Sequence, residues 1–141
     1  MNRLDLAALS LAVGCMLACA AAGADSAQRD LDSLIESADL EAGEEAFELC
    51  ASCHAYLPGE PAMIGPNLRG VVGRDVASAP DFEYSAALRG LGGRWDRERL
   101  DRFLRSPKTY APGTLMDSSG VRDDEERAAI IAFLETLNAT D

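Results

Sequence analysis

The sequence lacks alternating runs of β-branched residues, an internal repeat and a long low-complexity tract. These absences argue against a sheet or a repeat fold and favour helices joined by irregular loops. Glycine and proline cluster between about residues 58 and 113, so we expect loops there. The 141 residues suffice for one modest domain and a leader. The predicted fold class is all-α.

Basic residues are scarce: Lys108 is the only lysine, and 13 basic residues face 24 acidic ones, for a formal charge of −11. This balance argues against a nucleic-acid partner, because phosphate binding needs a concentrated positive surface. Residues 25–49 hold nine acids and one arginine, whereas residues 69–108 hold nine basic and six acidic residues. The chain is therefore acidic at its start and mildly basic in its middle.

Charge is nearly absent from the first 24 residues. Arg3 is followed by an uncharged apolar run over residues 6–23, and the small residues 22–24 form a cleavage site typical of a signal peptide. A retained membrane anchor is the main alternative, because about 18 apolar residues are at the lower limit of a membrane span. Lipid modification of Cys15 or Cys19 and a buried core helix are further alternatives.

These observations divide the chain into three parts. Residues 1–24 are predicted to be a signal peptide or N-terminal membrane anchor, residues 25–38 an acidic linker, and residues 39–141 the main domain. In each case the main domain lies outside the cytoplasm, in the periplasm or at the outer face of the cytoplasmic membrane.

Histidine is present once, as His54, and it directly follows Cys50 and Cys53 in the pattern C-x-x-C-H. On a helix the first and fourth positions share a face, so both thiols can form thioethers with the vinyl groups of one haem. The imidazole that follows can then reach the iron from the same side. The motif therefore predicts one covalent haem c, with iron, and His54 as a ligand.

Three other interpretations of this motif were compared. A structural zinc site needs four nitrogen or sulfur ligands, and the chain beyond its leader offers three adjacent ones. A thioredoxin-like redox pair would follow a strand, whereas residues 41–49 have a helical pattern. A disulfide between Cys50 and Cys53 would close a very tight loop.

Without a second histidine, methionine is the candidate for the other iron ligand. Met63 lies nine residues after His54, too close to cross easily to the opposite haem face. Met116 lies 62 residues after His54, beyond Pro112 and Gly113, which interrupt helices and favour an extended loop. We predict Met116 as the second ligand, with ordinary packing of this side chain as the alternative.

With these residues in view, the chain closely resembles class I c-type cytochromes, especially mitochondrial cytochrome c and its periplasmic or membrane-anchored bacterial relatives. The resemblance covers about residues 39–138. Its motifs occur in one order: Gly43, Phe47, the Cys50–His54 motif, residues 64–74, Phe82-Glu83-Tyr84, Trp95, residues 106–110, residues 112–116, Arg127 and residues 130–134.

This resemblance implies the class I cytochrome c fold, in which crossed N- and C-terminal helices and shorter middle helices surround one haem. It implies that Pro66 offers its carbonyl to the free ring nitrogen of His54, a bond that orients a metal ligand. It further implies a set of donors to the haem propionates: Arg74, Tyr84, Trp95 and Thr114.

The resemblance also implies a function: a monomeric single-electron carrier that is not an enzyme and has no catalytic residues. Its partners would be redox proteins such as a quinol–cytochrome c reductase, a terminal oxidase or a dehydrogenase. We expect the basic middle segment, including Arg105 and Lys108, to dock an acidic partner; the alternative is that these cations pair with nearby acids.

Two departures from the family pattern bear on this function. Phe103 stands where the family often has a tyrosine with its hydroxyl near the methionine sulfur, and Ser118 stands where mitochondrial members have a phenylalanine that shields the haem. A weakened bond to Met116 would suit the alternative function, a peroxidase-like or gas-binding haem protein with a displaceable ligand.

Helix positions follow from capping residues. Asp39, Asp96 and Asp123 are predicted N-caps. They begin helices over about residues 40–52, a middle helix that ends at Ser106-Pro107, and a last helix over about residues 124–137. A short helix over residues 84–91 is also predicted.

Overall fold

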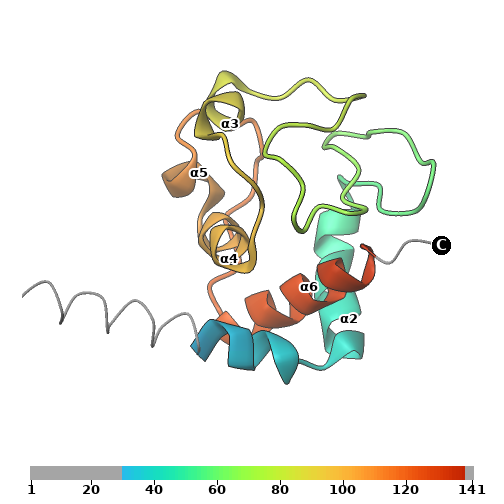
Figure 1. Cartoon of the computed structure of the whole chain (residues 1–141), viewed down its shortest axis with the longest axis vertical. Coiled ribbons are helices and arrows are strands. Elements are labelled where there is room, and N and C mark those ends of the chain that lie inside the picture. The colour runs from blue at the N-terminus through green and yellow to red at the C-terminus, as the bar shows by residue number, and fades with distance from the viewer. Residues whose placement is uncertain (1–29, 139–141) are drawn as a thin grey trace, which may run out of the picture.

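The computed structural model describes residues 30–138. Residues 30–36 are helical, followed by α2 (Leu40–Ala51), α3 (Ala86–Leu91), α4 (Arg97–Arg105), α5 (Pro107–Tyr110) and α6 (Asp124–Thr136) (Figure 1). Within this range no strand is present, only an isolated bridge between Asp75 and Arg94. The expected all-α class is confirmed.

The first and last of the longer helices, α2 and α6, pack across each other (Figure 1). Gly43 lies at the crossing, where an added Cβ would be 2.3 Å from the carbonyl oxygen of Ala129. Only glycine lets the two backbones approach this closely. One turn later, the Phe47 ring is buried with its centroid 5.1 Å from that of Phe133. The predicted crossed pair of helices is therefore present.

Aspartates start the three longest helices. Each accepts a hydrogen bond from a backbone N–H two or three residues later, at 2.8–2.9 Å; these residues are Asp39, Asp96 and Asp123. Such bonds satisfy amides that have no partner within the helix and place negative charge at the positive end of its dipole. The three predicted caps are confirmed, and α2 and α6 each end one residue earlier than expected.

The last helix is buried on nearly all sides over residues 127–134. Arg127 is fully buried, and its guanidinium donates to Asp101 at 2.8 Å and to three carbonyls just before and at the start of the helix. Asp124 accepts a further bond from it. A buried cation needs this complete set of acceptors, and here the set fixes residues 121–123 against the helix that follows.

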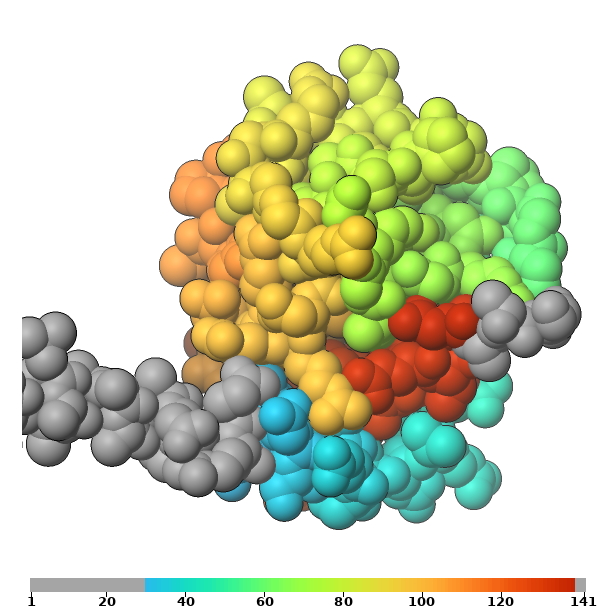
Figure 2. Space-filling model, in the orientation of Figure 1, coloured from blue at the N-terminus to red at the C-terminus, as the bar shows by residue number. Residues whose placement is uncertain are grey.

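Residues 30–36, which the sequence assigns to an acidic linker, form a helix instead. Ile35 is 3% exposed and belongs to the hydrophobic core, with Leu31 and Leu34 packed against it. Figure 2 shows this segment in blue, lying against α4 and α6. The packed domain therefore begins before residue 39, because three apolar side chains of the acidic segment share one helical face.

An arginine on α4 holds the same segment from the outside. Arg97 makes two parallel bonds to Glu135 of α6, at 2.7 and 2.9 Å, and a third to Asp32 at 3.2 Å. The hydrogen bond that Arg97 donates to Glu135 raises the pKa of this guanidinium. Arg97 thus joins three segments that are distant in sequence.

Within residues 30–138, no helix is both long and apolar enough to cross a membrane.

The remaining helices are short and surround an aromatic cluster. Ser85 caps α3, so the short helix begins slightly later than residue 84. The middle helix ends at Arg105, as predicted, but Pro107 then starts the additional short helix α5. Proline is favoured at a first helical position because its missing N–H is not needed there. The Phe103 ring lies 5.0 Å from Trp95 and 6.0 Å from Tyr110.

Candidate functional site

Both cysteines of the motif lie at the C-terminal end of α2. Cys50 is in its last turn, and its carbonyl accepts hydrogen bonds from the N–H groups of Cys53 and His54, both at 3.0 Å. The two cysteines form no disulfide and are partly buried. Burial is the main cause that raises the pKa of the Cys50 thiol. The chain thus continues the helical turn through the motif and keeps its three side chains close together.

The imidazole of His54 is held by the loop that follows. Its Nδ1 lies 2.8 Å from the carbonyl oxygen of Pro66, which can only accept, so Nδ1–H donates. Burial lowers the pKa of His54, and the bond to Pro66 opposes this effect only in part. A lowered pKa favours the neutral ring near neutral pH, and the Nδ1–H bond to Pro66 leaves Nε2 as the nitrogen that can bind a metal. A neutral imidazole held through one nitrogen is the form that binds iron through the other.

A glycine makes room for this ring. A Cβ at Gly65 would lie 2.2 Å from Cε1 of His54, so a larger residue would displace the imidazole. The Gly65 N–H donates to the carbonyl of Cys53 at 2.9 Å, which ties the loop to the end of α2. The backbone of this loop therefore sets the orientation of the histidine.

Asn67 is a positioning residue that our sequence reasoning did not single out. Its side-chain amide donates to the carbonyls of Leu57 and Glu60, both at 3.0 Å, and its oxygen accepts from the N–H of Arg69 at 2.8 Å. It therefore joins two loops next to Pro66. Its position directly after Gly65-Pro66 was the available signal, since asparagine often bonds loop backbone.

The segment with Met116 has the expected loop conformation. The Thr114 N–H donates to the carbonyl of Ala111 at 2.9 Å, and its hydroxyl accepts from the Met116 N–H at 3.3 Å. The Met116 side chain is partly buried against the hydrophobic core, whereas Met63 is 53% exposed. Of the two methionines considered, the buried one is the one predicted as a ligand.

The other predicted haem contacts are engaged within the protein. Arg74 donates to the carbonyls of Arg69 and Asn67, both at 3.1 Å. The Tyr84 hydroxyl accepts from the Ala79 N–H at 3.4 Å. Trp95 is buried in the aromatic cluster. Local hydrogen bonds and packing thus order these side chains.

The cations expected to dock an acidic partner are paired with nearby acids. Lys108 Nζ lies 2.6 Å from Asp117, and this contact lowers the pKa of the Asp117 carboxyl. Arg105 lies 3.2 Å from Asp124 and 3.5 Å from Asp101. These contacts agree with the alternative of local ion pairs.

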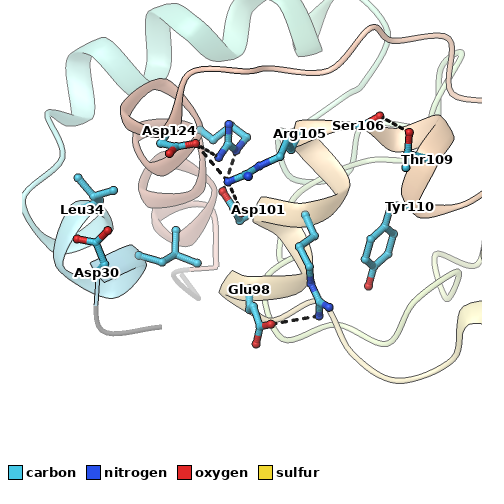
Figure 3. Close-up of a pocket in the computed structure, with 12 residues that line it drawn as sticks. Asp30, Leu34, Glu98, Asp101, Arg105, Ser106, Thr109, Tyr110 and Asp124 are labelled. Carbon is cyan, nitrogen blue, oxygen red and sulfur yellow. Dashed lines mark hydrogen bonds and ion pairs between the residues drawn. The ribbon is translucent and has the colours of Figure 1, made fainter. Parts of the chain in front are cut away.

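A separate cleft lies between residues 30–34 and the corner of α4 and α5 (Figure 3). None of the residues lining it is a cysteine, histidine or methionine. Its ion pairs, drawn as dashed lines, include Arg105 with Asp124 and Arg102 with Glu98. Because its cations are already paired, we assign no cofactor to it.

Comparison with known proteins agrees with this geometry. The family model described as "Cytochrome c" matches residues 40–138. The chain belongs to the cytochrome c family. Membership confirms the class I helical fold and the cofactor expected from the motif, a covalently bound haem c with its iron.

Individual relatives are bacterial. A cytochrome c homolog of Bradyrhizobium diazoefficiens is 39% identical over 82% of this chain and 63% of its own length. Cytochrome c2 of Rhodomicrobium vannielii is 40% identical over 67% of this chain and 75% of its own length. The solved structure of cytochrome cH from Methylobacterium extorquens has a TM-score of 0.65 and 39% identity, covering 70% of this chain and 98% of that one.

Several of these relatives are longer than the matched region. The chain spans 63% of the Bradyrhizobium protein and 54% of the cytochrome cy of Rhodobacter capsulatus, to which it is 42% identical over 77% of its own length. The match therefore covers the cytochrome domain of these proteins and leaves the rest of their length uncompared.

The donors in this site fit a haem of this kind. Two cysteines that form no disulfide and an imidazole whose Nε2 is left for a metal lie together at the end of α2, and Cys50 and Met116 both pack against one apolar cluster. This is the chemistry that a c-type haem requires: sulfur for two thioethers, a nitrogen ligand and an apolar surround.

Proposed function

We propose that the protein is a diffusing or tethered single-electron carrier whose haem iron is bound by His54 and Met116. The observation that carries this proposal is the bond of His54 to Pro66 beside two cysteines that form no disulfide. It leaves one imidazole nitrogen for the metal and fixes the ring in one orientation. When bound, the haem supplies reversible one-electron chemistry.

In this proposal Cys50 and Cys53 would hold the haem through thioethers, since both lie in one helical turn at the end of α2. Met116 supplies the second ligand from a loop stiffened by Thr114 and Pro112. A histidine–methionine pair raises the reduction potential, because the soft thioether favours reduced iron. Ligands held by the surrounding structure move little as the charge changes, which keeps electron transfer fast.

Four donors would bind the haem propionates: Arg74, Tyr84, Trp95 and Thr114. Each carries an N–H or O–H group, which a partly buried carboxylate requires. Arg74 has free N–H capacity beyond its two carbonyl bonds, because a guanidinium has five donors. These four donors would then hydrogen-bond the propionates and offset their negative charge.

In this proposal the protein acts on the outer side of the cytoplasmic membrane. Residues 1–24 would act as a signal peptide or anchor, and they lie outside the described residues, as do residues 25–29 of the proposed acidic linker. Redox partners of this family include reductases, oxidases and dehydrogenases that exchange single electrons, and such a role needs no catalytic residue.

Near-infrared and visible spectra test the ligation. Oxidised protein should show a sulfur-to-iron band near about 700 nm and should not bind carbon monoxide rapidly when reduced. Met116→Ala should abolish the band and open the iron to carbon monoxide. Met63→Ala is the matched control and should change neither property, because Met63 is exposed.

The alternative function has a distinct outcome in the same experiment. Phe103 is buried beside Trp95 and carries no hydroxyl, so it cannot donate to a methionine sulfur. Rapid carbon monoxide binding by the unmutated protein would identify a displaceable ligand and favour a gas-binding or peroxidase-like role. Loss of the band in Met63→Ala with its retention in Met116→Ala would refute the ligand assignment.

A further inference from the structure

We propose that the surface around the haem attachment site binds its redox partner through apolar contacts bordered by acidic side chains, so that the partner presents an apolar patch edged with basic residues. This inference rests on the proposed function, because electron transfer requires a partner to approach the haem edge. We name the surface the apolar rim and define it as Leu49, Met63, Ile64 and Leu115.

The exposed fractions of these side chains are unusual. Leu49 is 76% exposed, Ile64 78% and Leu115 81%, and Met63 is also exposed. In the described part of the chain, the other exposed large apolar side chains are Leu40, which is 50% exposed, and Leu57, which is 49% exposed. Single exposed apolar residues are normal on protein surfaces, but a group of them at one site marks an interaction surface.

Contacts place the rim beside the motif. Leu49 directly precedes Cys50, and the backbone on either side of Ile64 is tied to the motif because Met63 N–H donates to Gly65 and Gly65 N–H donates to Cys53, both at 2.9 Å. Leu115 directly precedes Met116. Three rim residues thus lie on segments next to the motif, and the fourth lies next to the proposed ligand Met116.

Charge beside Leu49 is acidic. Glu45 and Glu48 are exposed on α2 next to Leu49. On the methionine side, the Lys108 cation is paired with Asp117. The whole chain carries −11. A basic border on the partner would therefore be attracted at long range, whereas a second copy of this chain would be repelled.

The apolar rim then acts after the encounter. Burial of large apolar side chains stabilises the short-range complex without requiring fixed ion pairs. Long-range charge would set the rate of encounter and the rim would set how long the partner stays near the haem edge. A partner with an acidic face is unsuited to this surface.

The test uses two inorganic oxidants and the full haem-loaded protein. Cobalt(III) tris-phenanthroline is cationic and apolar, whereas hexacyanoferrate(III) is anionic and polar; each accepts one electron from the reduced protein. The second-order rate with the cobalt complex should fall as salt rises, and the rate with hexacyanoferrate should increase. Leu49→Gln and Leu115→Gln should each lower the rate with the cobalt complex by about threefold or more.

Leu40→Gln is the matched control, because Leu40 is an exposed leucine at the other end of α2, and its rate should be unchanged. Reduction potential and the near-infrared band should be the same in every variant, which separates docking from ligation. As a readout independent of electron transfer, the redox-inert chromium(III) tris-phenanthroline should broaden the amide resonances of Leu49, Ile64 and Leu115 more than that of Leu40.

Each outcome has one meaning. Three results would overturn the apolar rim while leaving the electron carrier intact. The first is an equal rate in the rim variants and the control, and the second is broadening away from the rim. The third is a faster reaction with hexacyanoferrate whose rate falls as salt rises. Failure of the unmutated protein to exchange electrons with either complex would overturn the proposed function and this inference together.

Discussion

At the residue scale, the contact of His54 with Pro66 depends on Gly65, which precedes Pro66 and lies against the imidazole. A side chain at Gly65 would overlap the imidazole, with its Cβ 2.2 Å from Cε1. Gly65→Ala should destabilise the protein by about 1–3 kcal/mol, the usual cost of overpacking, and should shift the reduction potential by tilting the ligand. Thermal unfolding and a redox titration measure the two effects.

Gly90→Ala is the control for that substitution. Gly90 lies within α3 and an added Cβ would meet no atom within 4 Å, so alanine there should be neutral or slightly stabilising. An unchanged potential and stability in Gly65→Ala would show that the glycine has no role in orienting the ring.

Ala77 is the one non-glycine residue with a positive φ among those described, at 58°. The left-handed region costs an L-residue about 1–2 kcal/mol, and glycine loses about 0.4–1 kcal/mol through the entropy of the unfolded chain. Ala77→Gly should therefore stabilise the protein by up to about 1 kcal/mol. Ala87→Gly, inside α3, should have the opposite sign; destabilisation by both in a denaturant titration would contradict the account.

The sequence was sufficient for some of these residues and insufficient for others. The spacing of Cys50, Cys53 and His54 predicts a shared helical face, and the structure places them in one turn at the end of α2. The family resemblance supplied Pro66. Asn67 was missed because its three hydrogen bonds join loops whose approach depends on the whole fold.

At the element scale, the N-terminal segment of residues 30–36 should contribute to stability. Ile35 is 3% exposed in the core, so Ile35→Ala should destabilise the protein by about 2–3 kcal/mol, through lost burial and the cavity that remains. Leu40→Ala, at a half-exposed site on α2, should cost less than about 1 kcal/mol. Equal stability of the two variants in urea would mean that the segment is not docked.

The start of α6 should show a specific pH dependence. The hydrogen bond and charge of Arg127 lower the pKa of Asp124 from 3.8. The pair therefore stabilises the fold above that pH, and the stabilisation is lost as the pH falls through the lowered value. Asp124→Asn should be less stable than the unmutated protein at neutral pH, and the difference should shrink in acid. Glu125→Gln is the control, and a difference that is constant with pH would contradict this prediction.

The sequence predicted the helices whose first turns are stabilised by nearby capping residues. Asp39, Asp96 and Asp123 cap helices through bonds to residues two or three positions away, so sequence alone locates them. The helix over residues 30–36 was missed because its docking depends on Arg97, 65 residues from Asp32. Acidic composition suggested a solvated linker, and only the folded chain brings that cation and the apolar core to it.

At the scale of the whole molecule, the fold class followed from the missing strand pattern and from motifs whose order matches the family. The interpretation of charge at this scale left two alternatives open, a docking face and local ion pairs. Nine basic residues between positions 69 and 108 suggested a positive docking face, but Arg105 and Lys108 pair with Asp124 and Asp117. Net charge over a segment does not reveal which cations the fold leaves unpaired.

The haem also belongs to the account of the whole molecule. The apolar core is small for a domain of this length, and a haem bound at Cys50 and Cys53 would add a large apolar surface beside Trp95 and Met116. Covalent attachment therefore connects folding to function, and the central claim is that these two thiols carry the cofactor.

The intact mass of the exported protein, with peptide mapping of residues 40–60, tests that claim most directly. We predict a mass equal to the polypeptide plus one haem, with the added mass on the peptide that contains Cys50 and Cys53 and no free thiol at either position. An exported, folded protein with the mass of the bare polypeptide and two titratable thiols at these positions would contradict the account.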